Sequence, residues 1–382
     1  MNDLIQFCAT VRQVEVLESV IKNGSNAKAA KALGLNRRTV DQTIQSIKHH
    51  ASKRSPQAHD YTKTVPEGYQ IKGVSQYVNA EGKVSGQWIK TAIDAEKQAE
   101  MLKEMIAVMC SDIPKLDAIK APKKSNTDLL NIIPMGDPHF GLYSWAAESG
   151  EDFDTTLARN LTLGAVDRLM ESSPQADTCI ILPLGDVFHA NDQSNVTPGH
   201  KHQLDVDTRF VKVLGIGIET YRHAVIRALE KHPKVIVRFV SGNHDPQAIW
   251  ALAFTISAFF ADNPRVTVDL SPSKFWYYQH GKVLIGSTHG DTVKHEQLLG
   301  VMASDKSAEW GATKHRYWYT GHVHSQHVRE YPGVVCESFR TLAAKDAYAS
   351  GHGYRAGRDM LCITHHKDHG EVERHRCDIG MI

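Results

Sequence analysis

The sequence predicts a layered α/β domain preceded by a small all-α unit, and two observations carry this prediction. Residues 1–55 place apolar side chains at the three- and four-residue spacing of amphipathic helices. From about residue 126 the pattern changes to short runs rich in Ile and Val, which alternate with longer helical stretches. Such alternation is typical of an α/β fold. We therefore expect a helical unit at residues 1–56 and a larger domain at residues 126–382.

The N-terminal unit is expected to contain three short helices. The first ends near Gly24, the second begins behind Ser25 and ends at Gly34, and the third opens at Asn36. Glycine reaches positive φ without steric cost, so Gly34 suits a tight turn between two helices. The last two helices resemble a helix-turn-helix, a motif that binds DNA.

The second helix of this motif would present polar side chains to a DNA groove. Between residues 22 and 54 there are eight Lys or Arg and one acidic residue, although the formal net charge of the whole chain is only +1. The side chains expected to contact phosphates and base edges are Asn36, Arg37, Arg38, Thr39 and Gln42. The alternative is a helical dimerisation or packing module with a solvated basic face.

Residues 57–125 are interpreted as a connector. Gly and Pro punctuate residues 66–88, which indicates a small hairpin, and a polar helical run follows around residues 91–112. A proline and three lysines in residues 119–127 mark the boundary before the next apolar run.

Composition excludes several classes of protein. The six cysteines form no CxxC pair, which argues against a disulfide framework and a structural zinc knuckle. No apolar run approaches the roughly 20 residues needed to span a bilayer, and the N-terminus lacks the order of a secretory signal. We expect a cytoplasmic protein.

Five polar motifs directly follow the candidate strands. They read GDPHFG, GDVFH, GNHD, THGD and GHVH and begin at residues 136, 185, 242, 288 and 321. In open α/β sheets, ligands bind beyond the carboxyl ends of the strands, so these remote segments can converge on one site. Asp, Asn and His supply oxygen and imidazole ligands suited to Mn, Fe or Zn, and a set without Cys disfavours a closed structural zinc site. The motifs predict a catalytic metal centre.

In this order the motifs resemble the five signature blocks of calcineurin-like metallophosphoesterases, over residues 130–325. The resemblance implies a two-sheet β-sandwich flanked by helices, with a dinuclear metal site. The ligands implied for one ion are Asp137, His139, Asp186 and His324, and those for the other are Asp186, Asn243, His289 and His322. Asp186 would bridge ions about 3.5–4 Å apart, and a metal-bound hydroxide would be the nucleophile. Mn²⁺ is the metal expected first, with Fe, Zn or Mg as alternatives.

Three residues beside these ligands are expected to act on the substrate. His244 would stabilise charge or protonate the leaving oxygen. Asp245 would orient His244 or cap the helix that follows. The segment GDVFHAN resembles the second block of DNA repair nucleases, where the histidine positions the DNA phosphate. This likeness makes His189 a substrate or catalytic residue, and the alternative is a surface histidine.

A phosphoesterase domain joined to a DNA-reading module predicts a DNA nuclease, and this combination resembles metallophosphoesterases of phage genomes. Little chain follows residue 345, so no long C-terminal capping domain of the repair-nuclease kind is expected, and a partnership with an SMC-like ATPase is doubtful. A homo-oligomer is possible. The alternatives are a phosphatase or cyclic-nucleotide phosphodiesterase acting on small or protein phosphoesters, and a DNA-binding regulator with an inactive fold.

Two stretches beyond the last motif carry many polar rings and cations. Residues 340–358 form a basic, aromatic, glycine-interrupted loop that could grip a nucleic-acid backbone or could be an ordinary surface connection. Four histidines near the C-terminal end lie outside the five motifs and are expected to be solvated: His365, His366, His369 and His375.

Overall fold

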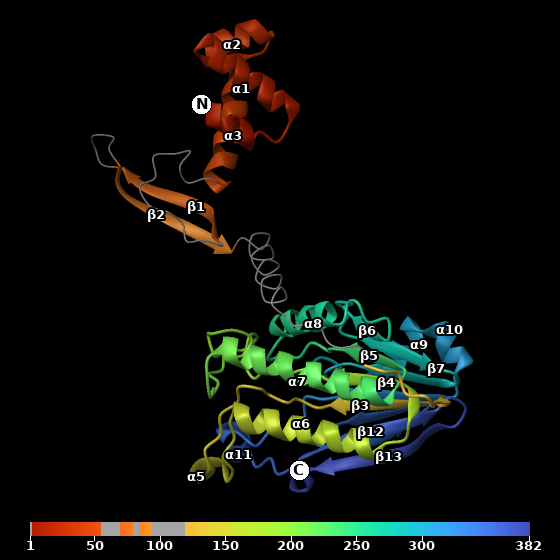
Figure 1. Ribbon diagram of the computed structural model, residues 1–382. Coiled ribbons are helices and arrows are strands. Elements are labelled where there is room, and N and C mark those ends of the chain that lie inside the picture. Colours follow the sequence, from red (N-terminus) through yellow and green to blue (C-terminus); the bar gives the residue numbers. More distant parts are fainter. Residues whose placement is uncertain (1, 55–68, 79–83, 94–118) are drawn as a thin grey trace. The chain divides into compact units, whose positions relative to one another are not determined.

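The computed structural model describes residues 2–54, 69–78, 84–93 and 119–382, which belong to two compact units, Met1–Met105 and Ile106–Ile382 (Figure 1). No helix in the described part of the chain is long and apolar enough to cross a membrane.

Helices with well-defined ends build the N-terminal unit. They are η1 Asn2–Phe7, α1 Val11–Asn23, α2 Asn26–Leu33 and α3 Arg37–Arg54. Gly24 and Gly34 end α1 and α2 at φ values of 72° and 64°, and the Ser25 side chain caps α2 by accepting from the backbone N–H of Lys28. One apolar cluster that includes Leu17 and Ile47 holds the helices together. The expected helical unit is confirmed, with its turns at the two glycines.

Two antiparallel strands, β1 Tyr69–Val78 and β2 Val84–Ile93, follow in the same unit. They overlap residues 66–88, where the sequence indicates a hairpin. Most of the helical run expected around residues 91–112 lies outside the described residues.

Two sheets form the frame of the C-terminal unit. The six-stranded sheet has the order β13-β12-β3-β4-β5-β6, and the five-stranded sheet has the order β10-β11-β9-β8-β7. The strands of the first sheet are β3 Asn126–Met135, β4 Ala176–Pro183, β5 Lys234–Arg238, β6 Val266–Asp269, β12 Asp359–His366 and β13 Gly370–Asp378. Those of the second are β7 Trp276–His280, β8 Val283–Ser287, β9 His315–Thr320, β10 His327–Tyr331 and β11 Val334–Ser338.

Alternating side chains explain why the sheets stack as layers. Successive residues of a strand point to opposite faces. On β4, Ile180 belongs to the apolar cluster between the two sheets, whereas its neighbours Cys179 and Ile181 belong to the cluster beneath the helices. Because both faces of β4 are buried, its sequence is an unbroken apolar run instead of an alternating one.

Helices cover the outer faces of both sheets. The cluster beneath the six-stranded sheet takes in side chains of α6 Thr155–Ser172, α7 Phe210–Lys231 and α8 Ala248–Phe259 (Figure 1). On the other side, α9 His295–Asp305 buries Leu298 and Met302 against the five-stranded sheet. Four shorter helices complete the unit: α5 Ala146–Ser149, α10 Ser307–Ala312, α11 Ala347–Gly351 and η3 Ile379–Met381.

The two-sheet sandwich flanked by helices is confirmed, and the five expected strands are β3, β4, β5, β8 and β9.

The expectation that the histidines near the C-terminal end are solvated is wrong for His365. This residue lies on β12 and is fully buried, with its Nε2 2.7 Å from the hydroxyl oxygen of Tyr319 on the facing sheet. A polar side chain entered the core because the tyrosine there satisfies one of its nitrogens.

The buried His365 should make the fold sensitive to acid. Burial lowers the pKa of this imidazole to about 3, so the native state stays neutral where the unfolded chain takes up a proton. Neutral His365 makes its full contribution to the free energy of unfolding above about pH 6.5. This contribution is lost progressively as the pH falls towards 3, by roughly 1.4 kcal/mol per pH unit. Urea unfolding at several pH values should show a shallower pH dependence in His365→Gln than in the wild type. The matched control, His366→Gln on the same strand, should leave the slope unchanged; an unchanged slope in His365→Gln would contradict the prediction.

Candidate metal centre

The strand ends bring the predicted ligands together in two groups. The first joins Asp137 and His139, which follow β3, to His324, which follows β9; their ligand atoms lie within 4.8 Å of one another. The Nε2 of His324 is 3.0 Å from Asp137 Oδ2 and 3.1 Å from His139 Nε2. Three donors on two different sheets thus point at one spot.

The second group joins Asp186, which follows β4, to His289 and His322, which follow β8 and β9. The Nε2 of His289 lies 3.2 Å from Asp186 Oδ2 and 3.0 Å from the side-chain oxygen of Asn243. The backbone N–H of His139 donates to the carbonyl oxygen of Asp186 at 3.1 Å, which ties the two groups side by side. All seven predicted ligands therefore belong to one site.

The electrostatics of the site call for positive charge. Asp137 is fully buried, and its Oδ1 has no hydrogen-bond partner among the described residues. A buried carboxylate oxygen without a partner is costly unless a cation neutralises it. Burial disfavours a charge on His289, but the carboxylate of Asp186 outweighs it and raises the pKa of this imidazole to about 10. These donors fit hard or borderline divalent metal ions.

The backbone beneath the ligands is strained. Among the described residues, seven that are not glycine have positive φ, and five of them are predicted ligands. These five are Asp137, His139, Asp186, His322 and His324, with φ between 34° and 68°. Such conformations each cost of order 1–3 kcal/mol and cluster at functional sites, because the rest of the fold must hold them. The strain turns carboxylates and imidazoles that follow the strands into one space.

Glycines make room for the ligand side chains. A Cβ built on Gly321 would collide with Oδ1 of Asp137, and one built on Gly242 would collide with Oδ1 of Asp186. The glycine that opens the last motif therefore protects a ligand of the first motif. This explains why Gly stands directly before the ligand in these motifs.

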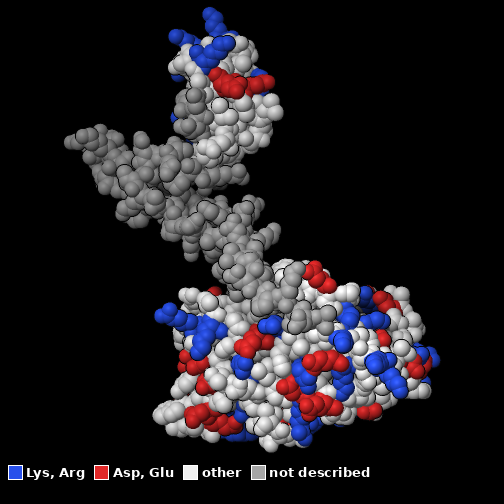
Figure 2. Space-filling model, in the orientation of Figure 1, with Lys and Arg blue, Asp and Glu red and all other residues white. Residues whose placement is uncertain are grey.

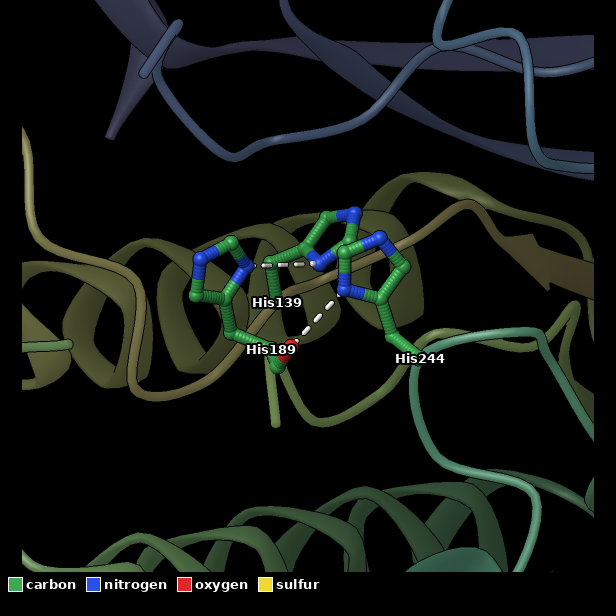
Figure 3. Close-up of side chains that lie close together, drawn as sticks. All are labelled: His139, His189 and His244. Carbon is green, nitrogen blue, oxygen red and sulfur yellow. Dashed lines mark hydrogen bonds between the residues drawn. The ribbon is translucent and has the colours of Figure 1, made fainter. Parts of the chain in front are cut away.

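His244 stands beside the first group. Its Nδ1 lies 2.8 Å from the carbonyl oxygen of His189, and its ring is 4.9 Å from that of His139 between centroids (Figure 3). Since a carbonyl can only accept, Nδ1 carries the proton and Nε2 is left for other partners. The backbone N–H of His244 donates to Oδ1 of Asp186 at 2.7 Å, which fixes the loop.

Asp245 does neither of the two things expected of it. Its buried carboxylate accepts from the backbone N–H groups of Phe188 and Gly242, each at 3.1 Å, whereas the His244 ring bonds to the carbonyl oxygen of His189. It holds the second motif against the third. The helix α8 is capped instead by Asn191, whose side-chain oxygen accepts from the first backbone N–H groups at 2.9 and 3.1 Å. Sequence reasoning missed Asn191, although it closes the segment GDVFHAN.

His189 is not a surface histidine, because only 2% of it is exposed. Its Nδ1 lies 3.3 Å from Nδ1 of His139, and its ring stacks on that of His244 (Figure 3). Burial lowers the pKa of His189 to about 3, so the ring is neutral.

Thr341 is a second residue of the site that the sequence motifs did not indicate. Its hydroxyl donates to the carbonyl oxygen of Asp137 at 2.6 Å.

The residues expected to contact DNA belong to the other unit and are all exposed: Asn36, Arg37, Arg38, Thr39 and Gln42. Lys and Arg side chains gather at one end of this unit (Figure 2). Within it, Asn36 accepts from the backbone N–H of Arg38 at 2.9 Å, which caps α3, and Arg37 lies 3.7 Å from Asp41.

No family model matches the sequence, and no curated protein matches it. Solved structures that are similar include a predicted phosphoesterase of Streptococcus pneumoniae, at 10% identity over 66% of this chain and 99% of the other, with a TM-score of 0.28. Vps29 of Entamoeba histolytica complexed with zinc is 14% identical over 65% and 99%, with a TM-score of 0.30. A dimetal phosphatase of Danio rerio is 9% identical over 65% and 99%, with a TM-score of 0.33. Sequence identities and TM-scores this low carry no argument about activity. Any activity must therefore be inferred from the residues of the site itself.

Substituting Gly321→Ala should empty the metal centre without unfolding the protein. The added methyl group displaces the carboxylate of Asp137, so bound metal should fall from about two ions per chain to one or none, measured by elemental analysis. The control is Gly300→Ala on α9, where a Cβ meets nothing within 4 Å. That variant should keep its metal. Full metal content in Gly321→Ala would refute the role given to this glycine.

Proposed function

We propose that the chain is a calcineurin-like metallophosphoesterase, a phosphodiesterase that uses two divalent ions and cleaves DNA. The observation that carries the proposal is the pair of adjoining Asp/His groups, each with a buried carboxylate and two imidazoles. One such group alone would suit many metal sites. Two side by side suit the clamping of attacking and leaving oxygens at one phosphorus.

Asp137, His139 and His324 would hold one ion, and His289, His322 and Asn243 the other. Asp186 would bridge them; its place in the second group and its backbone link to His139 support this role. Bound divalent ions would supply an activated water and neutralise the charge that develops on the phosphate. Mn²⁺ is the first choice, with Fe, Zn or Mg as alternatives.

His244 would act on the leaving group. Because Nδ1 donates to the carbonyl of His189, the ring is held in one orientation with Nε2 available. Nε2 can carry a proton to the departing oxygen or stabilise its charge.

His189 would act through a ligand instead of through the substrate, because it is almost fully buried. With His189 neutral, the N–H at Nδ1 of His139 can donate to Nδ1 of His189, and this leaves Nε2 of His139 for the metal. Such outer partners fix the tautomer and direction of metal-binding histidines. The role first expected for His189 thus becomes that of a positioning residue.

DNA is the proposed substrate on two independent grounds. The segment GDVFHAN resembles the repair-nuclease form of the second block, and α2 with α3 resembles a helix-turn-helix whose outer side chains are exposed and basic. The N-terminal unit would tether the catalytic unit to duplex DNA.

The deciding measurement is Mn²⁺-dependent cleavage of labelled linear, nicked and single-stranded DNA, run beside an aryl phosphodiester. We expect the wild type to hydrolyse both kinds of ester and Asp186→Asn to lose at least about a thousandfold, since the bridge is gone. His244→Ala should keep its metal and slow the reaction roughly 10²–10⁴-fold. Aryl-ester hydrolysis without DNA cleavage would favour a small-substrate phosphodiesterase, and full activity in Asp186→Asn would refute the metal mechanism.

The paired substitution of Arg37→Ala and Arg38→Ala should weaken duplex DNA binding and flatten its salt dependence, because each lost phosphate contact releases one counterion fewer. Hydrolysis of the aryl ester should be unchanged. The control pair Lys282→Ala with Lys367→Ala, at exposed positions of the other unit, should leave DNA affinity as it is. Equal losses on both substrates would contradict a division of labour between the two units.

A further inference from the structure

Exposed aromatic rings are concentrated around two short helices. Five aromatic side chains of the described residues are largely exposed: Tyr143, Trp145, Phe254, Tyr348 and Tyr354. All except Phe254 stand on or close beside α5 and α11, and 46–64% of each of these four residues is exposed. The two helices lie side by side (Figure 1), and the hydroxyl of Ser350 donates to the carbonyl oxygen of Glu148 across them at 3.5 Å. Apolar rings left in water on two adjoining elements indicate a binding surface.

Both segments start at the candidate metal centre. Tyr143 is four residues beyond His139, so it lies no more than about 14 Å from that ligand. The segment that leads to α11 begins at Thr341, which bridges to Gly136 and whose hydroxyl bonds the carbonyl oxygen of Asp137. A buried hydroxyl, that of Ser144, donates to the carbonyl oxygen of Lys345 at 2.6 Å and joins the two segments. The aromatic surface is therefore anchored to the loops that carry the metal ligands.

A small pocket of about 170 Å³ opens between these rings. It is lined by Tyr143, Ser144, Trp145, Glu148, Asp205 and Ala347. Neither carboxylate of the lining has a hydrogen-bond or ion-pair partner in the part of the chain that the structure describes. Aromatic side chains beside carboxylates that are free to accept suit a planar ring that carries N–H donors on its edge. The pocket is smaller than the roughly 300–1,000 Å³ that drug-sized ligands need, so a single small ring is the size of ligand that it suits.

We propose that this pocket binds one unpaired base of the DNA strand whose phosphodiester lies at the metal centre, and that it prefers a base with an exocyclic amino group. Trp145 and Tyr143 would stack on the base, as aromatic side chains do in single-strand binding proteins. Glu148 and Asp205 would accept from the amino group, as carboxylates accept from N4 of cytosine. Thymine offers no such donor.

The charges around the pocket favour a base over a phosphate as its occupant. Two carboxylates would repel a phosphate inside the pocket, whereas the backbone of the strand can run along the adjoining row of Tyr348, His352 and Tyr354. In this row the ring centroids are 4.0 and 6.1 Å apart, and the exposed Arg355 follows directly. Exposed aromatic rings next to a guanidinium group are typical of surfaces that bind single strands.

The base site rests on the proposed function for its place beside the scissile bond, but its binding can be measured without catalysis. Fluorescence anisotropy of the full chain with a metal chelator would compare oligodeoxycytidylate, oligothymidylate and an abasic strand of equal length. The wild type should bind the cytidine strand roughly tenfold more tightly than the abasic strand. Trp145→Ala, which removes a ring of the pocket lining, should reduce this ratio severalfold and leave abasic binding unchanged. Phe254→Ala, at an exposed ring on α8 that does not line the pocket, should keep the ratio.

The paired substitution of Glu148→Ala and Asp205→Ala, which removes both acceptors of the lining, should abolish most of the preference for cytidine over thymidine while stacking persists. Equal binding of abasic and base-bearing strands by the wild type, or a full ratio in Trp145→Ala, would overturn the base site. DNA cleavage with base-independent binding would refute this site alone. Base-dependent binding that Trp145→Ala abolishes, in a protein that hydrolyses no ester with Mn²⁺, would support the site and refute the proposed activity.

Discussion

The left-handed backbone under the proposed metal ligands is the constraint on which the rest of the site depends. Five ligands adopt positive φ, which non-glycine residues avoid unless the surrounding fold compels it. The carboxylates of Asp137 and Asp186 occupy the space that a side chain on Gly321 or Gly242 would need. Strand ends, glycines and ligands thus form one unit, in which the packed sheets provide the energy that keeps the loops strained.

Buried hydrogen bonds convert these loops into a single rigid site. Asp245 fastens the second motif to the third, Asn191 fastens the second motif to α8, and Thr341 fastens the first motif to the segment behind β11. They hold in place the loops that carry His244 and the two Asp/His groups.

Much of the fold and the ligand set could be predicted because each rests on a local pattern. Apolar runs marked β3, β4, β5, β8 and β9, and Gly-Asp, Gly-Asn, Thr-His or Gly-His pairs marked their ends. Contacts between distant segments leave no such mark. The burial of His365 depends on Tyr319 of the facing sheet, and the grip of Asp245 depends on Phe188. The aromatic pocket likewise joins Tyr143 to a segment some two hundred residues away, so only its basic and aromatic composition could be noticed in advance.

Each Asp/His group draws its members from both sheets. Asp137 and Asp186 follow strands of the six-stranded sheet, whereas His324, His289 and His322 follow strands of the five-stranded sheet. A bound ion would therefore connect the two sheets of the sandwich, and its binding free energy would stabilise the folded state of the whole unit. Loss of the metal would then do more than abolish the proposed activity. The two sheets would separate more readily, and cellular proteases would degrade the metal-free chain.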